Sequence, residues 1–325
     1  MKQRVLSGVR PTGPLHLGHL LGVIQNWKKF ENENAFYMIA DWHALTTEYD
    51  SKTTIKQNVL EVALDLLAGG LDPAKCTVFV QSHVKEHCEM SLLLSMLTPL
   101  AWLERNPTYK DQIQELGDKE LHTHGFLGYP VLQTADIILY KADIVPVGED
   151  QLAHLELSRE IVRRFHFIYG KKIFPEPQAS LTRVPKLPGT DGRKMSKSYG
   201  NAIYLSDSPA EVDNKVKQMV TDPARIKRED KGHPEVCPVF CYHKLFNAEQ
   251  ESLIAEECRG ALRGCVDCKR EMGGKLKEFL APIYERRRQF ASESGKVIEI
   301  LNDGARKARK VAAETMDEAK EAVGI

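Results

Sequence analysis

Short apolar runs alternate with amphipathic segments through the first half of the chain. Four of these runs predict buried strands, at residues 4–9, 35–40, 76–81 and 144–147. Between the first two runs, apolar residues recur at helical spacing from Leu20 to Trp27, and residues 53–68 form a second amphipathic pattern. Strands that alternate with helices predict an α/β fold with a Rossmann-like, doubly wound parallel sheet. Ligands of such sheets bind at the carboxyl ends of the strands.

The alternation stops in two places and divides the chain. Helical and polar sequence at about 88–128 predicts an insertion, and four prolines with two glycines mark a boundary at 174–192. Beyond about residue 205 the pattern is mostly helical and ends in an alanine-rich, charged segment. We therefore expect a Rossmann-like domain at 1–190, a loop or linker at 191–203, and a C-terminal α-helical domain at 204–325. Its last helix would pack back on the first domain.

Composition and charge bear on the partners of the chain and on its compartment. The 325 residues carry 45 basic and 45 acidic side chains, so net charge gives no sign of a nucleic-acid partner. A local basic segment at 270–310 fits either a solvated helix face or an RNA-contacting surface. No secretory segment and no apolar run of about 18 residues is visible, which predicts no membrane association. With seven cysteines, this pattern predicts a cytoplasmic chain whose thiols stay reduced or bind metal.

Two short motifs carry the candidate chemistry. Residues 11–19 read Pro-Thr-Gly-Pro-Leu-His-Leu-Gly-His and place His16, Gly18 and His19 at the start of a helix. A helix N-terminus and a glycine let a phosphate approach the backbone, and imidazoles can donate to its oxygens. Residues 194–198, Lys-Met-Ser-Lys-Ser, offer Lys194 and Lys197 on a loop that could close over a triphosphate. The pair predicts an ATP site in which His16, His19, Lys194 and Lys197 are catalytic; either motif alone also fits a structural role.

These motifs resemble the HIGH and KMSKS signatures of class I aminoacyl-tRNA synthetases. Further segments resemble the tryptophanyl-tRNA synthetases, at residues 40–47, 129–137, 145–151 and 308–312, so the resemblance spans nearly the whole chain. It implies a tryptophan–tRNA ligase that converts L-tryptophan and Mg²⁺-ATP into tryptophanyl-adenylate and pyrophosphate, and then charges tRNA(Trp). It also implies a homodimer. No protein nucleophile is expected, because positioning and charge stabilisation dominate this transfer.

The resemblance also assigns binding residues. Those implied for ATP are Arg10, Thr12, Gly18, His19, Gly148, Asp150, Lys194, Met195, Ser196, Lys197 and Ser198. Those implied for tryptophan are Leu6, Gly8, His43, Tyr129, Gln133, Asp136, Val145, Val147 and Gln151. Asp136 would accept the indole N–H, whereas Tyr129 and Gln151 would hold the amino group. The chemistry agrees, because indole has one donor and no acceptor, and a buried carboxylate left unpaired is costly.

Two positions depart from the family pattern. Gln133 stands where an apolar residue, often methionine, lies beside the indole, and Arg10 stands where glutamine is common. Gln133 adds a donor and an acceptor near the ring. This position therefore leaves tyrosine or a modified tryptophan open as the substrate.

Five of the seven cysteines fall between residues 237 and 268. Cys237, Cys258, Cys265 and Cys268 are separated by twenty, six and two residues. Four thiolates around one Cys-x-x-Cys pair suit Zn²⁺ or an iron–sulfur cluster, although zinc ribbons more often have two such pairs. A subset of tryptophanyl-tRNA synthetases has a similar motif that holds a [4Fe–4S] cluster, with a first spacing two residues longer. The resemblance implies this cluster, and the alternatives are a zinc site or four free thiols. Cys241 could substitute as a ligand. Cys76 and Cys88 are expected in the core.

Three rival functions follow from the same residues. A tyrosine-activating enzyme would share the fold, but a phenol would call for an additional donor in the pocket. A non-charging RNA-binding or redox-sensing paralogue would have no need for the histidines and lysines of the two motifs. A small-molecule adenylyltransferase would leave the C-terminal helical region unexplained.

Overall fold

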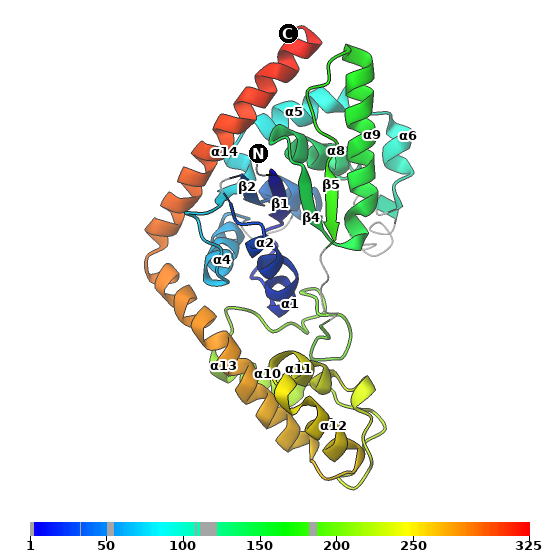
Figure 1. The fold of residues 1–325 in the computed structure, drawn as a ribbon, viewed down its shortest axis with the longest axis vertical. Coiled ribbons are helices and arrows are strands. Elements are labelled where there is room, and N and C mark those ends of the chain that lie inside the picture. The colour runs from blue at the N-terminus through cyan, green and yellow to red at the C-terminus, as the bar shows by residue number, and fades with distance from the viewer. Residues whose placement is uncertain (1–2, 33, 51–54, 108, 111–121, 182–186) are drawn as a thin grey trace.

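A five-stranded parallel sheet forms the centre of the molecule, in the order β3-β2-β1-β4-β5 (Figure 1). The computed structural model describes residues 3–32, 34–50, 55–107, 109–110, 122–181 and 187–325. The strands are β1 (Val5–Val9), β2 (Ala35–Ile39), β3 (Thr77–Val80), β4 (Ile144–Val147) and β5 (Gln178–Leu181). The first four confirm the strands predicted from apolar runs. The sequence did not predict β5, because this edge strand is short and has no buried residue.

Alternation along the strands sends side chains to the two faces of the sheet. In β2, Tyr37 and Ile39 enter one buried cluster with residues of α4 (Ile55–Ala68). Phe36 and Met38 enter a second cluster on the opposite face. That face is covered by α5 (Glu86–Ser95), α8 (His124–Leu139) and α9 (Leu152–Tyr169). Helices on both faces make this the doubly wound α/β fold that the sequence predicted.

The first motif leads from β1 into a helical segment. This segment consists of α1 (Leu17–His19), a π-helical turn (Leu20–Ile24) and α2 (Gln25–Lys28). Its apolar face is buried, as the spacing predicted. Trp27 stacks on Tyr37 with ring centroids 4.6 Å apart, and the Tyr37 hydroxyl donates to the Trp27 carbonyl at 2.6 Å. The motif is thereby fixed to the central strand β2.

Beyond residue 205 the described chain is helical, as expected. The helices are α10 (Pro209–Gln218), α11 (Pro238–Phe246), α12 (Glu251–Arg259), α13 (Cys265–Ser292) and α14 (Ser294–Val323). Figure 1 shows α10–α12 far from the sheet, with the long α13 leading back towards it. The last helix, α14, packs against the edge strand β3 so closely that a Cβ atom on Gly304 would lie 1.9 Å from the Val78 carbonyl oxygen.

The remaining short elements connect these parts. They are α3 (Asp41–Glu48), α6 (Leu100–Glu104) and 3₁₀ turns at Gln81–His83, Glu149–Gln151, Pro234–Val236 and Ala248–Gln250. Residues 108 and 111–121 of the expected insertion lie outside the described residues. Cys76 is buried as expected, but Cys88 is exposed, because it lies on the outer face of α5, and that expectation was wrong. None of the helices in the described part of the chain is both long and apolar enough to cross a membrane.

Candidate active site

A cavity of about 380 Å³ opens where the strand order reverses between β1 and β4. Its walls come from β1 and the residues after it, from the end of β4, and from α3 and α8. All nine residues expected at the tryptophan site line it: Leu6, Gly8, His43, Tyr129, Gln133, Asp136, Val145, Val147 and Gln151. The cavity therefore lies where doubly wound sheets bind their ligands.

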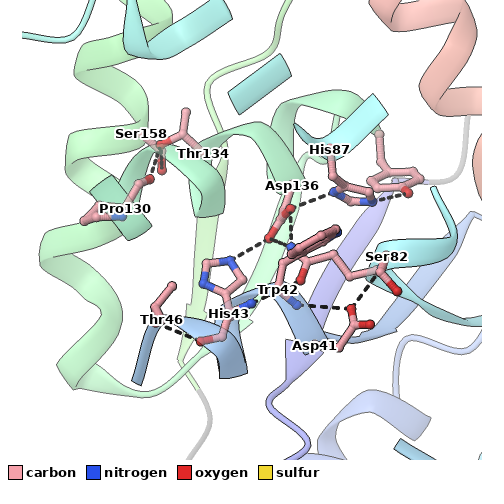
Figure 2. Close-up of polar contacts among 12 residues, drawn as sticks. Asp41, Trp42, His43, Thr46, Ser82, His87, Pro130, Thr134, Asp136 and Ser158 are labelled. Carbon is pink, nitrogen blue, oxygen red and sulfur yellow. Dashed lines mark hydrogen bonds and ion pairs between the residues drawn. The ribbon is translucent and has the colours of Figure 1, made fainter. Parts of the chain in front are cut away.

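Asp136 is a fully buried carboxylate at the wall of this cavity (Figure 2). It accepts hydrogen bonds from Gln81 Nε2 at 2.8 and 2.9 Å and contacts His43 Nε2 at 2.8 Å and His87 Nδ1 at 2.6 Å. Burial opposes ionisation, but the two histidines outweigh it and hold the pKa of Asp136 below its usual range. The group is therefore an ionised acceptor with no proton to donate.

A chain of hydrogen bonds continues from Asp136 into the core. His87 Nε2 lies 2.8 Å from the Tyr140 hydroxyl. Burial and the charge of Asp136 raise the pKa of Tyr140 well above its usual value, so the hydroxyl stays protonated beside the ring. Because the ionised Asp136 can only accept, His87 Nδ1 carries a proton and donates to it. Sequence reasoning missed Gln81, the last residue of the predicted strand 76–81, and His87, six positions after it.

A second polar group forms the wall beside Tyr129. The Tyr129 hydroxyl lies 2.7 Å from His154 Nε2, and Asn106 Nδ2 lies 2.9 Å from His154 Nδ1. Burial lowers the pKa of His154 to about 4, so the ring is neutral at physiological pH. Neither His154 nor Asn106 was predicted from the sequence. Gln151 lies on the same wall, and its amide donates to Asp150 at 2.8 Å.

The histidines of the first motif are held as neutral donors. The Gly18 N–H donates to His16 Nδ1 at 3.1 Å, and the His16 N–H donates to His19 Nδ1 at 3.3 Å. Burial, with a smaller effect of Lys197, lowers the pKa of His16 to about 4, and burial holds the pKa of His19 well below its usual value. Because both Nδ1 atoms accept, both Nε2 atoms carry the proton. Two N–H groups are thus available to an anion without any charge on the rings.

The second motif meets the first through one lysine. Lys197 Nζ donates to the Gly13 carbonyl at 2.7 Å, and burial lowers its pKa to about 8. Lys194 and Ser198 are exposed, and the Met195 side chain packs in the core, which leaves only its backbone for ligand contact. The Ser196 N–H donates to Asn201. In this conformation the structure brings Lys197, not Lys194, to the first motif.

The residues expected to bind ATP divide into two sets. Arg10, Thr12, His19 and Gly148 line the same cavity as Asp136. The lining does not include the second set, which consists of Gly18, Asp150, Lys194, Met195, Ser196, Lys197 and Ser198, and it does not include the catalytic candidate His16. The second set lies largely on the loop of the second motif, which connects the sheet to α10.

Comparisons with known proteins agree with this geometry. The family model described as tRNA synthetases class I (W and Y) matches residues 1–281. The chain belongs to this family. It is 52% identical to the tryptophan–tRNA ligase of Thermotoga maritima over 99% of each protein. It is 46% identical to that of Aquifex aeolicus over 99% of this chain and all of the relative.

Solved structures of class I synthetases give the same result. Tryptophanyl-tRNA synthetase from Campylobacter jejuni, complexed with ADP and tryptophan, superimposes with a TM-score of 0.89 and 34% identity. The match covers 99% of this chain and all of that chain. The protein is therefore an aminoacyl-tRNA synthetase with the fold of its family.

The basic segment of this synthetase is partly used inside the chain. Arg286 Nε donates to the Ala68 carbonyl at 2.8 Å, Arg287 Nε donates to Asp65 at 2.6 Å, and Arg309 donates to the His83 carbonyl. By contrast, Arg288 is exposed and pairs with Glu285 one turn away. Residues 270–310 therefore do not form one continuous free basic surface.

The four expected metal ligands line one small cavity of the synthetase. Cys237, Cys258, Cys265 and Cys268 surround about 20 Å³ of space, together with apolar side chains and the guanidinium groups of Arg225 and Arg263. Burial raises the pKa of Cys268 to about 12. Within the described residues, no group of three His, Cys, Asp or Glu side chains lies close enough together to hold a metal ion. In this conformation the thiols share a cavity without converging on one point, and Cys241 does not line it.

Proposed function

We propose that this synthetase activates L-tryptophan with ATP and transfers it to tRNA(Trp), which makes it a tryptophan–tRNA ligase. The observation that carries the proposal is the ionised Asp136, buried in the wall of a cavity that all nine expected residues line. An acceptor without a proton favours a ligand that has a ring N–H donor and no competing acceptor. The tryptophan–tRNA ligases to which the chain is similar over its full length support the same substrate.

Each side of the cavity has a separate part in amino-acid binding. Asp136 accepts the indole N–H in exchange for a contact with Gln81 or His43, because both oxygens of the carboxylate already have two partners each. Leu6, Val145 and Val147 pack against the ring. On the other wall, Tyr129 and Gln151 hold the amino group, and His154 keeps the Tyr129 ring in place. Gly8, His43 and Gln133 complete the lining.

The adenylate step takes place beside the first motif. The tryptophan carboxylate attacks the α-phosphorus of ATP, the bond to the β-phosphate oxygen breaks, and pyrophosphate leaves with the electron pair. Neutral His16 and His19 donate Nε2–H to the phosphate oxygens, and Lys197 supplies a positive charge. The nucleotide lies against Arg10, Thr12, Gly18 and Gly148. When the loop closes, the nucleotide also contacts Asp150, Lys194, Met195, Ser196 and Ser198. Mg²⁺ neutralises the triphosphate.

The transfer step needs the acceptor end of tRNA(Trp) at the mouth of this cavity. The terminal ribose hydroxyl attacks the carbonyl of tryptophanyl-adenylate, and AMP leaves with the electron pair. We place the anticodon end against the helical region at 204–325, joined to the catalytic domain at 1–190 by the loop at 191–203. Arg286 and Arg287 are not available for this contact, because both bind residues of α4.

A homodimer is the assembly that the family resemblance implies. Leu92 on α5, Met96 directly after this helix and Leu100 on α6 are exposed apolar side chains, 61–73% accessible. Exposed apolar side chains that lie together are typical of contact surfaces. We propose this patch as the contact between copies. Light scattering should report a dimer for the native chain and a smaller species for Met96→Glu.

We also propose that Cys237, Cys258, Cys265 and Cys268 hold a [4Fe–4S] cluster rather than zinc. The donor set fits, because the Arg225 guanidinium lies 3.8 Å from Cys258 Sγ and offsets thiolate charge, and apolar side chains line the rest of the cavity. Such a cluster would join α11, α12 and α13 and have no part in catalysis. Anaerobically purified protein should be brown with about four iron atoms per chain. Colourless protein with one zinc per chain would overturn this assignment.

Amino-acid-dependent ATP–pyrophosphate exchange, with tryptophan and tyrosine supplied separately, tests the main proposal. Exchange with tryptophan alone is expected. Exchange with tyrosine alone would move recognition to Gln133, whose amide could pair with a phenol. Exchange with neither amino acid would support a non-charging paralogue on the same fold.

A further inference from the structure

Asp65 is a fully buried carboxylate that amino-acid and ATP binding leave unused. It lies in α4, and both of its oxygens have partners. Oδ2 accepts the backbone N–H of Leu15 at 2.6 Å, and Oδ1 accepts Arg287 Nε at 2.6 Å. Leu15 directly precedes His16, so this carboxylate holds the backbone of the first motif just before α1 begins.

Arg287 comes from a distant part of the chain. It lies on α13, 222 positions from Asp65. Its guanidinium also binds Glu61, one helical turn before Asp65 on α4. The neighbouring Arg286 donates to the Ala68 carbonyl at the end of the same helix. The C-terminal part of α13 is therefore attached to α4 at several points, and one of these points continues directly to Leu15.

The second motif contacts the same turn of the chain. Lys197 Nζ donates to the Gly13 carbonyl, two residues before Leu15. Asp65 opposes the effect of burial on Lys197 and supports the charged form of its ammonium group. One carboxylate thus acts on both signature motifs, and its own charge is balanced by an arginine from the helical region.

We propose that Asp65 and Arg287 are positioning residues for adenylate formation: together they hold the turn at residues 13–16 where His16 and Lys197 can reach the triphosphate. The inference deepens the proposed function and rests on it. Burial raises the pKa of Asp65 above its usual value, and Arg287 offsets this effect only in part. Loss of Arg287 therefore leaves a buried carboxylate uncompensated, and the hydrogen bond to Leu15 is weakened with it.

A set of variants separates positioning from simple stability. Asp65→Asn and Arg287→Ala break the pair, Arg287→Lys restores the charge, and the double variant Asp65→Leu/Arg287→Met replaces it by apolar side chains. Such a replacement preserves a fold in many proteins, because it removes both desolvation costs. Arg288→Ala is the matched control, since Arg288 is 67% exposed and pairs with Glu285 on its own helix.

The first readout is ATP–pyrophosphate exchange per titrated active site. We expect kcat to fall about tenfold or more in Asp65→Asn, Arg287→Ala and the apolar double variant, with KM for tryptophan unchanged, because the hydrogen bond from Leu15 to a charged group is lost in the two Asp65 variants and weakened in Arg287→Ala. Arg287→Lys should recover part of the rate, and Arg288→Ala should match the native chain. A folded apolar double variant with native kcat would overturn the proposal.

A second readout does not depend on activity. Hydrogen–deuterium exchange should show fast exchange of the Leu15 amide in Asp65→Leu/Arg287→Met, which offers no side-chain acceptor, and slow exchange in the native chain and in Arg288→Ala. If the native chain fails to support exchange with either amino acid, the proposed function fails. The Leu15 amide then tests separately whether Asp65 holds the turn at residues 13–16, and equal protection in Asp65→Leu/Arg287→Met and the native chain would overturn the inference.

Discussion

Replacing Asp136 by asparagine is the sharpest test of amino-acid recognition. Asp136→Asn keeps the shape of the side chain and removes its charge. The carboxylate is surrounded by Gln81, His43 and His87, each with a nitrogen within 2.9 Å. An asparagine can meet these groups with only one oxygen, and its amide nitrogen cannot accept. The indole N–H therefore loses a charged acceptor that the whole network is arranged to orient.

The size of the effect follows from the type of hydrogen bond. A hydrogen bond to a charged group contributes about 1.5–3 kcal/mol, which corresponds to a fall of about 10- to 150-fold in kcat/KM for tryptophan. KM for ATP should change little, because Asp136 makes no contact with either signature motif. The matched control is Gln133→Met, one turn earlier on α8 in the same cavity wall, for which we expect a much smaller change.

An isosteric substrate shows whether the lost contact is the indole N–H. β-(3-Benzothienyl)alanine replaces this group by sulfur. The native enzyme should discriminate against it by the factor lost in Asp136→Asn, whereas the variant should accept both amino acids almost equally. Pyrophosphate exchange measures all four combinations. Equal discrimination in the variant and the native enzyme would refute the assignment of Asp136 as the indole acceptor.

Three further predictions concern the ATP site and the packing of the last helix. Lys197 must be charged to bind phosphate, and its pKa is lowered to about 8, so kcat/KM for ATP should fall as pH rises through about 8. Lys197→Ala should abolish this fall at alkaline pH and slow adenylate formation by orders of magnitude. The pKa of His16 is about 4 in the folded chain and 6.5 for the free group, so the unfolded chain binds the proton first as pH falls. Stability to urea should therefore fall as pH drops from about 6.5 towards 4. The fall should be smaller in His16→Gln than in the native chain. Gly304→Ala should cost about 2–3 kcal/mol of stability, because its Cβ would collide with the Val78 carbonyl. Gly295→Ala on the same helix, where a Cβ meets open space, should gain about 0.5–1 kcal/mol, and similar thermal shifts for the two variants would contradict the packing of α14 on β3.

Local sequence predicted the parts of the fold that depend on local interactions. The first four strands are runs of apolar residues, and burial on both faces of a parallel sheet requires such runs. The edge strand β5 has no buried residue and gave no signal. The same reason explains Cys88: residue type alone favours burial, but the face of α5 on which it lies is decided by packing.

Whether the sequence predicted a site residue also depends on whether its partners are near or distant in the chain. Positions within short motifs were found from the sequence, since a turn or helix start fixes neighbours such as His16 and Gly18 through the chain itself. His87 and His154 stand outside any motif and contact cavity residues only because other elements bring Asp136 and Tyr129 to them. Their single imidazoles carry no local signal that separates them from other core histidines.

The sequence by itself determined the family, the parallel sheet and most of the residues around the amino-acid cavity. The sheet follows from apolar periodicity and the two ATP motifs from residues close in the chain, whereas the family and the residues of the amino-acid cavity follow from the resemblance to known synthetases. Only the tertiary structure decided which long-range partners meet. Arg287 binds Asp65 across 222 positions, and Lys197, not Lys194, reaches Gly13. A buried charge is stable only beside a specific partner, and the choice of that partner depends on how the helices pack.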